Sequence, residues 1–248
     1  MGEIILFSIL GFFASIIDGC IGMAYGTILA SIFTLNGVPL LVSSASIHFS
    51  EIFTTFASGL SHLSFKNVDF KLLKKIVLPG ALGAIVGALM LSYASDKVLK
   101  PIVASYLIAL GIYILLKQRK KRKKKTKSFK RFKFLGLIGG FCDAAAGGGW
   151  GPIVTGTLIS RGHIPHKTIG TVNLTEFFVT LAQSAIFFSA IGLTSFNIVV
   201  GLILGSVIAA PFAAYIVKKI NPMVLIKLVG CIIILTNIIS LAMFFYEL

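Results

Sequence analysis

Hydrophobic residues run in eight long blocks along the chain, with short polar stretches between them. The blocks cover residues 4–35, 40–63, 72–94, 98–117, 134–160, 165–188, 196–217 and 223–245. Each block reaches the length of about 20 apolar residues that carries a helix across a bilayer, and none alternates as barrel strands do. The pattern predicts an all-α integral membrane protein.

An acid followed by glycines interrupts the first block of each half. Residues 143–152 read DAAAGGGWGP, and residues 18–26 read DGCIGMAYG. The two acids, Asp18 and Asp143, are 125 positions apart. Two such interruptions, one in each half, predict one site that is built twice.

The same offset of 125 positions relates the rest of the two halves without a gap. It pairs identical residues at 11 and 136, 37 and 162, 51 and 176, 55 and 180, and 80 and 205. Identities at glycines and buried acids are more than shared hydrophobicity produces, so they indicate a tandem duplication. We expect one membrane domain made of repeats 1–117 and 134–248, joined by a basic linker at 118–133.

The first block of each repeat is poorly suited to a single crossing. Residues 4–17 and 22–35 form two arms of 14 residues, about 21 Å of helix each, against about 30 Å of hydrocarbon. This favours a re-entrant hairpin of two half-helices, followed in each repeat by three transmembrane helices.

Charge gives an independent test of this topology. Of the formal charge of +15, most comes from residues 117–133, where 12 of 17 are Lys or Arg. Such a run can bind nucleic acid or anionic lipid, but in a multispanning protein it is typical of a cytoplasmic loop, and we expect no nucleic-acid partner. With the linker in the cytoplasm, hairpins leave nine other basic residues inside and two outside, whereas single crossings put seven outside. The count favours inverted repeats with both chain ends outside the cell membrane.

Inverted hairpins would bring their tips together near the midplane. Helix N-termini and glycine N–H groups would then face one shared space, which favours a small anionic ligand. The alternative for the glycines is close helix packing, and the equivalent aromatic residues either line the site or fill space. The expected substrate-binding residues here are Gly22, Tyr25, Gly26, Gly147, Gly148, Gly149, Trp150 and Gly151.

The two aspartates have two readings. Each could cap the helix arm that follows it, or each could bind a proton or another cation that is coupled to transport.

A polar stripe follows one face of the second block in each repeat. It contains His48, Glu51 and Thr55 in the first repeat and Asn173, Glu176, Thr180 and Gln183 in the second. These side chains either bond helices together or line a pathway that couples transport to protons. No further ligand cluster accompanies the pair His48 and Glu51, so we expect no metal site and no cofactor.

The doubled segment, with GGGWGP at 147–152 and IGTVN at 169–173, resembles the sulfite exporter TauE/SafE family, also called the 4-toluene sulfonate uptake permease family. The resemblance implies a transporter of sulfite, sulfoacetate or related organosulfur anions. It extends the expected substrate-binding set to Thr171, Asn173 and His48. The first repeat departs from the motif, with Met23, Ala24 and Tyr25 where glycines would be expected, so the two tips could have unequal roles.

Together these features predict a secondary transporter that works by alternating access, not an enzyme. The sequence contains no nucleotide-binding motif, so we do not expect ATP to be the energy source. The alternatives are a channel or a transporter for another small anion, or an intramembrane enzyme.

Overall fold

All the regular structure in the described part of the chain is helical. The computed structural model describes residues 2–117, 131–161, 163–192, 195–216 and 222–246. Its elements are α1 (Gly2–Ile21), α2 (Tyr25–Leu35), α3 (Leu40–Ser64), α4 (Phe70–Tyr93), α5 (Asp96–Lys117), α6 (Phe132–Ala146), the π-helical turn η1 (Gly151–Thr155), α7 (Gly156–Ser160), α8 (Pro165–Ile191), α9 (Phe196–Ile216) and α10 (Pro222–Tyr246). Residues 118–130 of the predicted linker and two basic residues of the charge count, Lys218 and Lys219, lie outside the described residues.

The outer surface of the bundle is suited to lipid. Within the described residues, α1, α4, α5, α8 and α10 are each long and apolar enough to cross a membrane. Large apolar side chains such as Leu78, Phe188 and Leu235 are exposed on the outer surface, where hydrocarbon would cover them. The prediction of an all-α integral membrane protein is confirmed.

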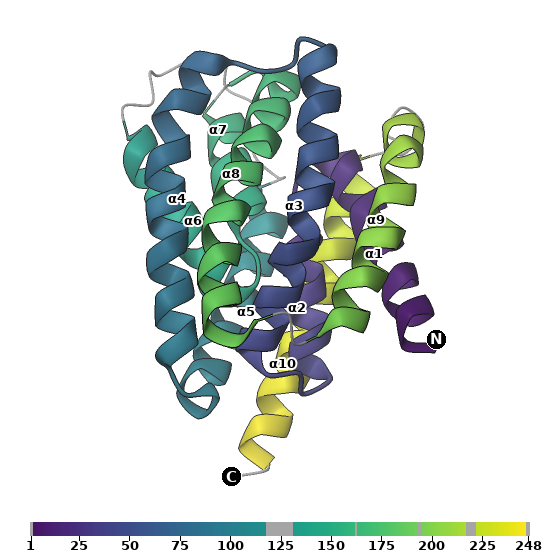
Figure 1. Ribbon diagram of the computed structural model, residues 1–248, viewed down its shortest axis with the longest axis vertical. Helices are drawn as coiled ribbons and strands as arrows, with labels where there is room; N and C mark the ends of the chain where they lie inside the picture. The colour runs from purple at the N-terminus through teal and green to yellow at the C-terminus, as the bar shows by residue number, and fades with distance from the viewer. Residues whose placement is uncertain (1, 118–130, 162, 193–194, 217–221, 247–248) are drawn as a thin grey trace.

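The first block of each half is broken into two helices. The ends of these two helices that point away from the break lie at the same end of the bundle. In the first half, Asn197 near the start of α9 donates a hydrogen bond to Glu3 of α1 (3.0 Å), and α2 turns into α3 where Leu40 N–H reaches Asp96 (3.3 Å). In the second half, α6 begins and α7 ends at the other end of the bundle, where the α3–α4 turn lies (Figure 1). The two hairpins therefore enter from opposite ends.

One arm is longer than expected. The structure extends α1 over 20 residues, about 30 Å of helix, whereas the sequence suggested a 14-residue arm. The extra turns carry the helix past Asp18 to Ile21, because no helix-breaking residue stands between them except Gly19.

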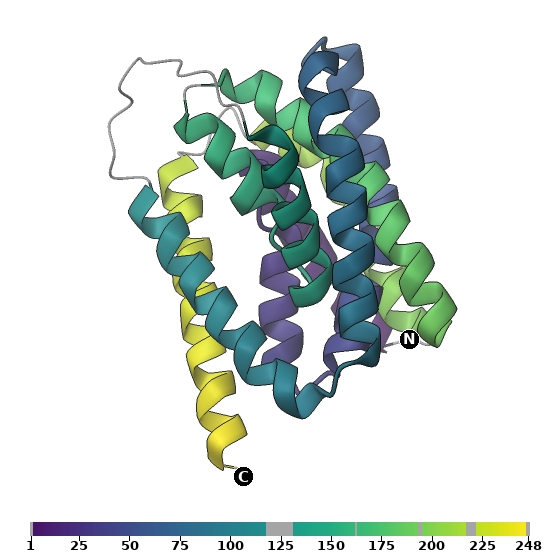
Figure 2. The ribbon, with the colours of Figure 1, turned by 90° about the vertical axis from the view of Figure 1, so that its left-hand side faces the viewer.

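The helices of the two halves interlock. Helix α1 packs along α9, and α6 packs along α4, while α5 and α10 run side by side (Figure 2). A Cβ on Gly11 would meet the carbonyl oxygen of Leu202 at 2.7 Å, and one on Gly136, its repeat equivalent, would meet that of Ile76 at 2.8 Å. Small residues at these crossings let two backbones approach closely. Each hairpin is thus held mainly by a helix from the other half.

Candidate functional site

The tip of the first hairpin is a short loop stabilised by an aspartate. Gly22 and Ala24 both have positive φ, 68° and 112°, and Tyr25 begins α2. The Tyr25 N–H donates to a carboxyl oxygen of Asp18 at 3.3 Å. This bond satisfies one of the N–H groups that the start of a helix leaves without an intrahelical acceptor.

The tip of the second hairpin repeats this geometry. Gly147 and Gly149 have φ of 70° and 158°, and the Trp150 N–H donates to Asp143 at 3.0 Å. All these positions follow their counterparts by 125 residues. Each aspartate therefore makes the contact that the capping interpretation expects.

The two tips touch through their glycines. A Cβ on Gly148 would lie 2.3 Å from the backbone nitrogen of Thr27, and one on Gly26 would lie 2.7 Å from the carbonyl oxygen of Gly147. A Cβ on Gly151 would meet Met23 at 2.8 Å. In this conformation all three glycines serve close backbone packing between the hairpins, and Gly26 and Gly151 also line the cavity beside the tips.

A small cavity remains beside the touching tips. Its volume is about 20 Å³, which is room for about one water molecule. The wall draws on α1, α2, α3, α6, α8 and η1 and on the loops of both tips: Asp18, Ala24, Tyr25, Gly26, Thr27, Glu51, Thr54, Thr55, Asp143, Gly149, Gly151, Pro152 and Glu176. The structure thus brings together the acids that the sequence predicted from both repeats.

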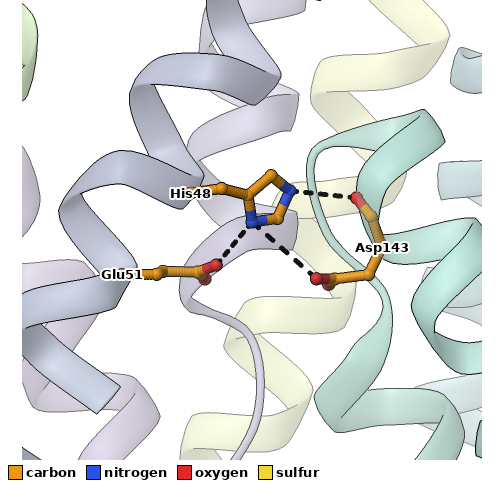
Figure 3. A group of neighbouring side chains, drawn as sticks. All are labelled: His48, Glu51 and Asp143. Carbon is orange, nitrogen blue, oxygen red and sulfur yellow. Dashed lines mark hydrogen bonds and ion pairs between the residues drawn. The ribbon is translucent and has the colours of Figure 1, made fainter. Parts of the chain in front are cut away.

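A buried histidine joins α3 to the second hairpin (Figure 3). His48 Nδ1 lies 2.7 Å from Glu51 Oε2 and 3.7 Å from Asp143 Oδ2, and His48 Nε2 lies 3.1 Å from the backbone oxygen of Asp143. From α8, Gln183 Nε2 donates to Asp143 Oδ2 at 3.0 Å and lies 2.8 Å from His48 Nδ1. His48, Glu51, Asp143 and Gln183 are all buried.

The distances in this network require a proton between His48 and Glu51. A backbone carbonyl can only accept, so Nε2 carries a hydrogen toward Asp143. A contact of 2.7 Å between Nδ1 and the Glu51 carboxyl is a hydrogen bond only if one of the two atoms holds a proton. The pair therefore contains one proton. Because Gln183 Nε2 can only donate to Nδ1 at 2.8 Å, this geometry places that proton on the Glu51 carboxyl.

The ligand atoms of His48, Glu51 and Asp143 lie within 4.8 Å of one another. The histidine–glutamate pair thus has a third candidate ligand, which the sequence did not reveal because it comes from α6. In the structure these atoms bond directly to each other and to Gln183.

The equivalent aromatic residues have different roles. Tyr25 lines the cavity, and its hydroxyl lies 2.9 Å from the hydroxyls of both Ser50 and Ser206. Trp150 is fully buried outside the cavity wall and donates from Nε1 to the backbone oxygen of Val172 at 3.3 Å. The first lines the site and the second packs beside it.

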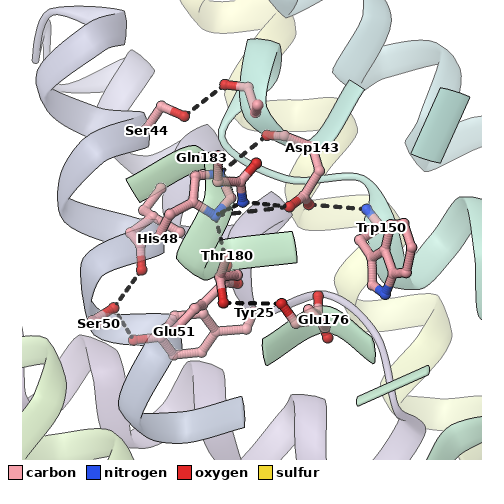
Figure 4. Close-up of polar contacts among 12 residues, drawn as sticks. Tyr25, Ser44, His48, Ser50, Glu51, Asp143, Trp150, Glu176, Thr180 and Gln183 are labelled. Carbon is pink, nitrogen blue, oxygen red and sulfur yellow. Dashed lines mark hydrogen bonds and ion pairs between the residues drawn. The ribbon is translucent and has the colours of Figure 1, made fainter. Parts of the chain in front are cut away.

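Several other predicted residues lie outside the cavity wall. Asn173 donates to Ser58 at 2.9 Å, and Thr180 donates to the Glu176 backbone at 2.9 Å (Figure 4). The Thr171 hydroxyl accepts the Asp69 N–H at 2.7 Å, toward the end of α8 that begins at Pro165. Also outside the wall are Gly22, Gly147, Gly148, His48 and Gln183, which contact the tips or the buried network.

Sequence reasoning missed some of the wall and its support. Thr27 and Pro152 are equivalent positions directly after the motif glycines, and their place in the motif was the available signal. Ser206 on α9 carries no pattern of its own, because its contact with Tyr25 spans 181 positions of sequence.

Comparisons with known proteins find a matching family model and two similar proteins. Residues 7–239 match the family model described as sulfite exporter TauE/SafE. The chain is 40% identical over 246 residues to a Bacillus subtilis (strain 168) protein named "Probable membrane transporter protein YtnM", covering 96% of this chain and 82% of that protein. It is 30% identical over 105 residues to the Arabidopsis thaliana "Sulfite exporter TauE/SafE family protein 3", covering 42% of this chain and 20% of that one. No solved structure matches the chain.

Proposed function

Because the chain belongs to the sulfite exporter TauE/SafE family of membrane transporters, we propose that it moves small organosulfur anions such as sulfite, sulfoacetate or related sulfonates. Transport is secondary and follows alternating access, with the anion bound between the two hairpin tips. The family name supports the substrate class, and the meeting of the two hairpin tips supports the proposed position of the site.

One observation carries this proposal: two broken hairpins enter from opposite ends and meet beside one small cavity. Broken helices that meet inside a bundle are the usual setting of a transporter site, since their ends offer unsatisfied backbone groups to an ion. The cavity is too small for an organosulfur anion, so the conformation described here is closed. Binding requires the tips to separate, which a hairpin shift toward either end would provide.

The topology belongs to the proposal as well. The repeats 1–117 and 134–248 are inverted, the linker 118–133 is cytoplasmic, and both chain ends are outside. Asn36 and Arg161 are equivalent positions at the exposed ends of the two hairpins. In a background without cysteines, single cysteines at these two positions should react with an impermeant maleimide from opposite sides of the membrane. Reaction of both cysteines from the same side would rule out inverted repeats.

Protons are the proposed coupling ion. Glu51 and Glu176 lie at equivalent positions in the wall, with Asp18 and Asp143 beside them. Ionisable groups inside a membrane protein are costly unless they serve a pathway or a partner. Thr55 and Thr180 donate to the backbone oxygens of Glu51 and Glu176, and Gln183 donates to the Asp143 carboxyl.

Counterflow tests the function. Proteoliposomes preloaded with unlabelled sulfoacetate should accumulate labelled sulfoacetate transiently and saturably. A channel would equilibrate the label without this overshoot, and an enzyme would release altered product. An imposed pH gradient should change the net flux, and an unchanged flux would exclude proton coupling while leaving the transport itself intact.

A further inference from the structure

Among the residues that the structure describes, the cavity at the hairpin tips is lined by acids and by no basic side chain. Asp18, Glu51, Asp143 and Glu176 reach it from α1, α3, α6 and α8, and no Lys or Arg occurs among its lining residues. A site for an anion would be expected to offer positive charge or hydrogen-bond donors. This wall offers the opposite, which constrains how an anion can enter.

The hydroxyl and N–H donors beside these acids are largely engaged already. Thr27, Thr54 and Thr55 each donate their one hydroxyl proton to a helix carbonyl, at 3.1, 3.2 and 2.5 Å. The first N–H of each returning arm donates to Asp18 or Asp143. A ligand in the cavity therefore meets mostly lone pairs, together with the first-turn N–H groups of α2, which lack an acceptor inside the helix.

Protonation reverses this character. An ionised carboxylate about 5 Å from a bound anion would weaken binding by about two orders of magnitude at an effective dielectric constant of about 20. A protonated carboxyl removes that repulsion and donates one hydrogen bond to an anion oxygen. We propose that the anion enters only with protons on these carboxyls, so that anion and protons cross the membrane in the same direction. This inference rests on the proposed function.

The structure indicates where the first proton is held. The His48–Glu51 pair already contains one at its 2.7 Å contact, and the other oxygen of Glu51 approaches the first tip, 3.2 Å from a Cβ placed on Gly26. The groups that face Glu51 are Asp18 on α1, Tyr25 on α2, His48 on α3, Asp143 on α6 and Glu176 on α8. With its one proton the His48–Glu51 pair carries no net charge, so Glu51 would repel the entering anion less than an ionised carboxylate would.

Glu176 is the second proton carrier in this proposal. In the part of the chain that the structure describes, its carboxyl has no hydrogen-bond partner, because Asn173, the counterpart of His48, bonds to Ser58 instead. Its proton is therefore free of the histidine that fixes the one on Glu51.

The sign of proton movement tests the proposal. Purified protein is reconstituted into vesicles loaded with sulfoacetate, a sulfonate whose charge is constant near neutral pH, and the membrane potential is held at zero with potassium and valinomycin. Sulfoacetate leaving down its gradient should acidify the outer medium in step with the flux. Alkalinisation, or flux with no proton movement, would overturn shared transport and leave the proposed function standing. If neither sulfoacetate nor methanesulfonate moves, the proposed function fails and this inference falls with it.

A variant pair separates coupling from folding. Glu51→Gln mimics the protonated carboxyl but cannot release its proton, so net efflux should fall about 100-fold while exchange of labelled against unlabelled sulfoacetate falls far less. A purely structural role for Glu51 would reduce exchange and net efflux equally, which would contradict the proposal. Glu3→Gln, at the exposed start of α1, serves as the matched control and should leave both rates unchanged.

Discussion

Among the glycines of the hairpin tips, Gly148 is the position where one added methyl group would make the closest contact. In Gly148→Ala, the new Cβ would lie 2.3 Å from the backbone nitrogen of Thr27 and 2.5 Å from the carbonyl carbon of Gly26. Both atoms belong to backbone, so no side chain can rotate away. The tips must separate by about 1 Å to restore an ordinary contact of 3.4 Å.

The expected magnitude follows from overpacking. Forcing a methyl group into a close-packed contact costs about 1–3 kcal/mol. If the whole cost appears in the closed state, unfolding should occur at a temperature lower by about 2–4 °C for each kcal/mol in a protein of this size. If the hairpins separate instead, the same energy shifts the balance between closed and open forms by about 5–150-fold.

Two assays distinguish these routes. Thermal unfolding in detergent measures the loss of stability. Separation of the hairpins is measured by the rate at which a water-soluble maleimide reacts with Thr55→Cys, a buried position in the cavity wall. The background lacks Cys20, Cys142 and Cys231. Gly2→Ala is the control, since a Cβ there has nothing within 4 Å, and it should change neither readout.

The outcome that refutes this reasoning is a Gly148→Ala protein that unfolds at the wild-type temperature and labels at the wild-type rate. The hairpin tips would then not be in contact in the protein, and the small closed cavity would not exist as described.

Substitutions at three further positions test the tips individually. Ala24→Gly should stabilise the protein by about 1 kcal/mol, because Ala24 has φ of 112° and glycine removes the strain of that conformation; an unchanged or lower unfolding temperature would contradict it. Asp143→Ala should destabilise by about 0.5–2 kcal/mol through loss of the bond from Trp150 N–H, while Asp143→Asn retains an oxygen acceptor and should lose less stability; equal losses would argue against capping. Trp150→Phe removes the Nε1–H donor to the buried carbonyl of Val172 and should lower the free energy of unfolding by about 1 kcal/mol in chemical denaturation. Trp150→Tyr should remain less stable than the wild type.

The sequence predicted the membrane class, the two broken segments and the acids of the cavity, because each leaves a local pattern. Long apolar blocks mark helices, an acid followed by glycines marks a break, and the offset of 125 pairs Asp18 with Asp143 and Glu51 with Glu176. These patterns depend on neighbours in sequence or on duplication, both of which are visible without coordinates.

The partners of these residues could not be predicted in the same way. The contact of His48 with Asp143 spans 95 positions, and that of His48 with Gln183 spans 135. Both depend on how α3, α6 and α8 cross, and those crossings involve close packing at small residues such as Gly59 of α3 against Leu174 of α8, which no local motif marks. The same crossings decide that glycines which looked like a ligand cradle, Gly26 and Gly148, press against each other.

The two halves share a broken-hairpin scaffold but not the same chemistry. Glu51 is bonded to His48, whereas Glu176 has Asn173 at the equivalent position, and Asn173 is turned toward Ser58. Tyr25 lines the cavity through a hydroxyl held by Ser50 and Ser206, whereas Trp150 is buried beside it. If the halves exchange conformations during transport, as inverted repeats allow, the two end states cannot be mirror images in energy, because only one half carries the bonded histidine. The proposed proton on Glu51 would then be bound more tightly than the one on Glu176, so the two glutamates would release their protons in a fixed order.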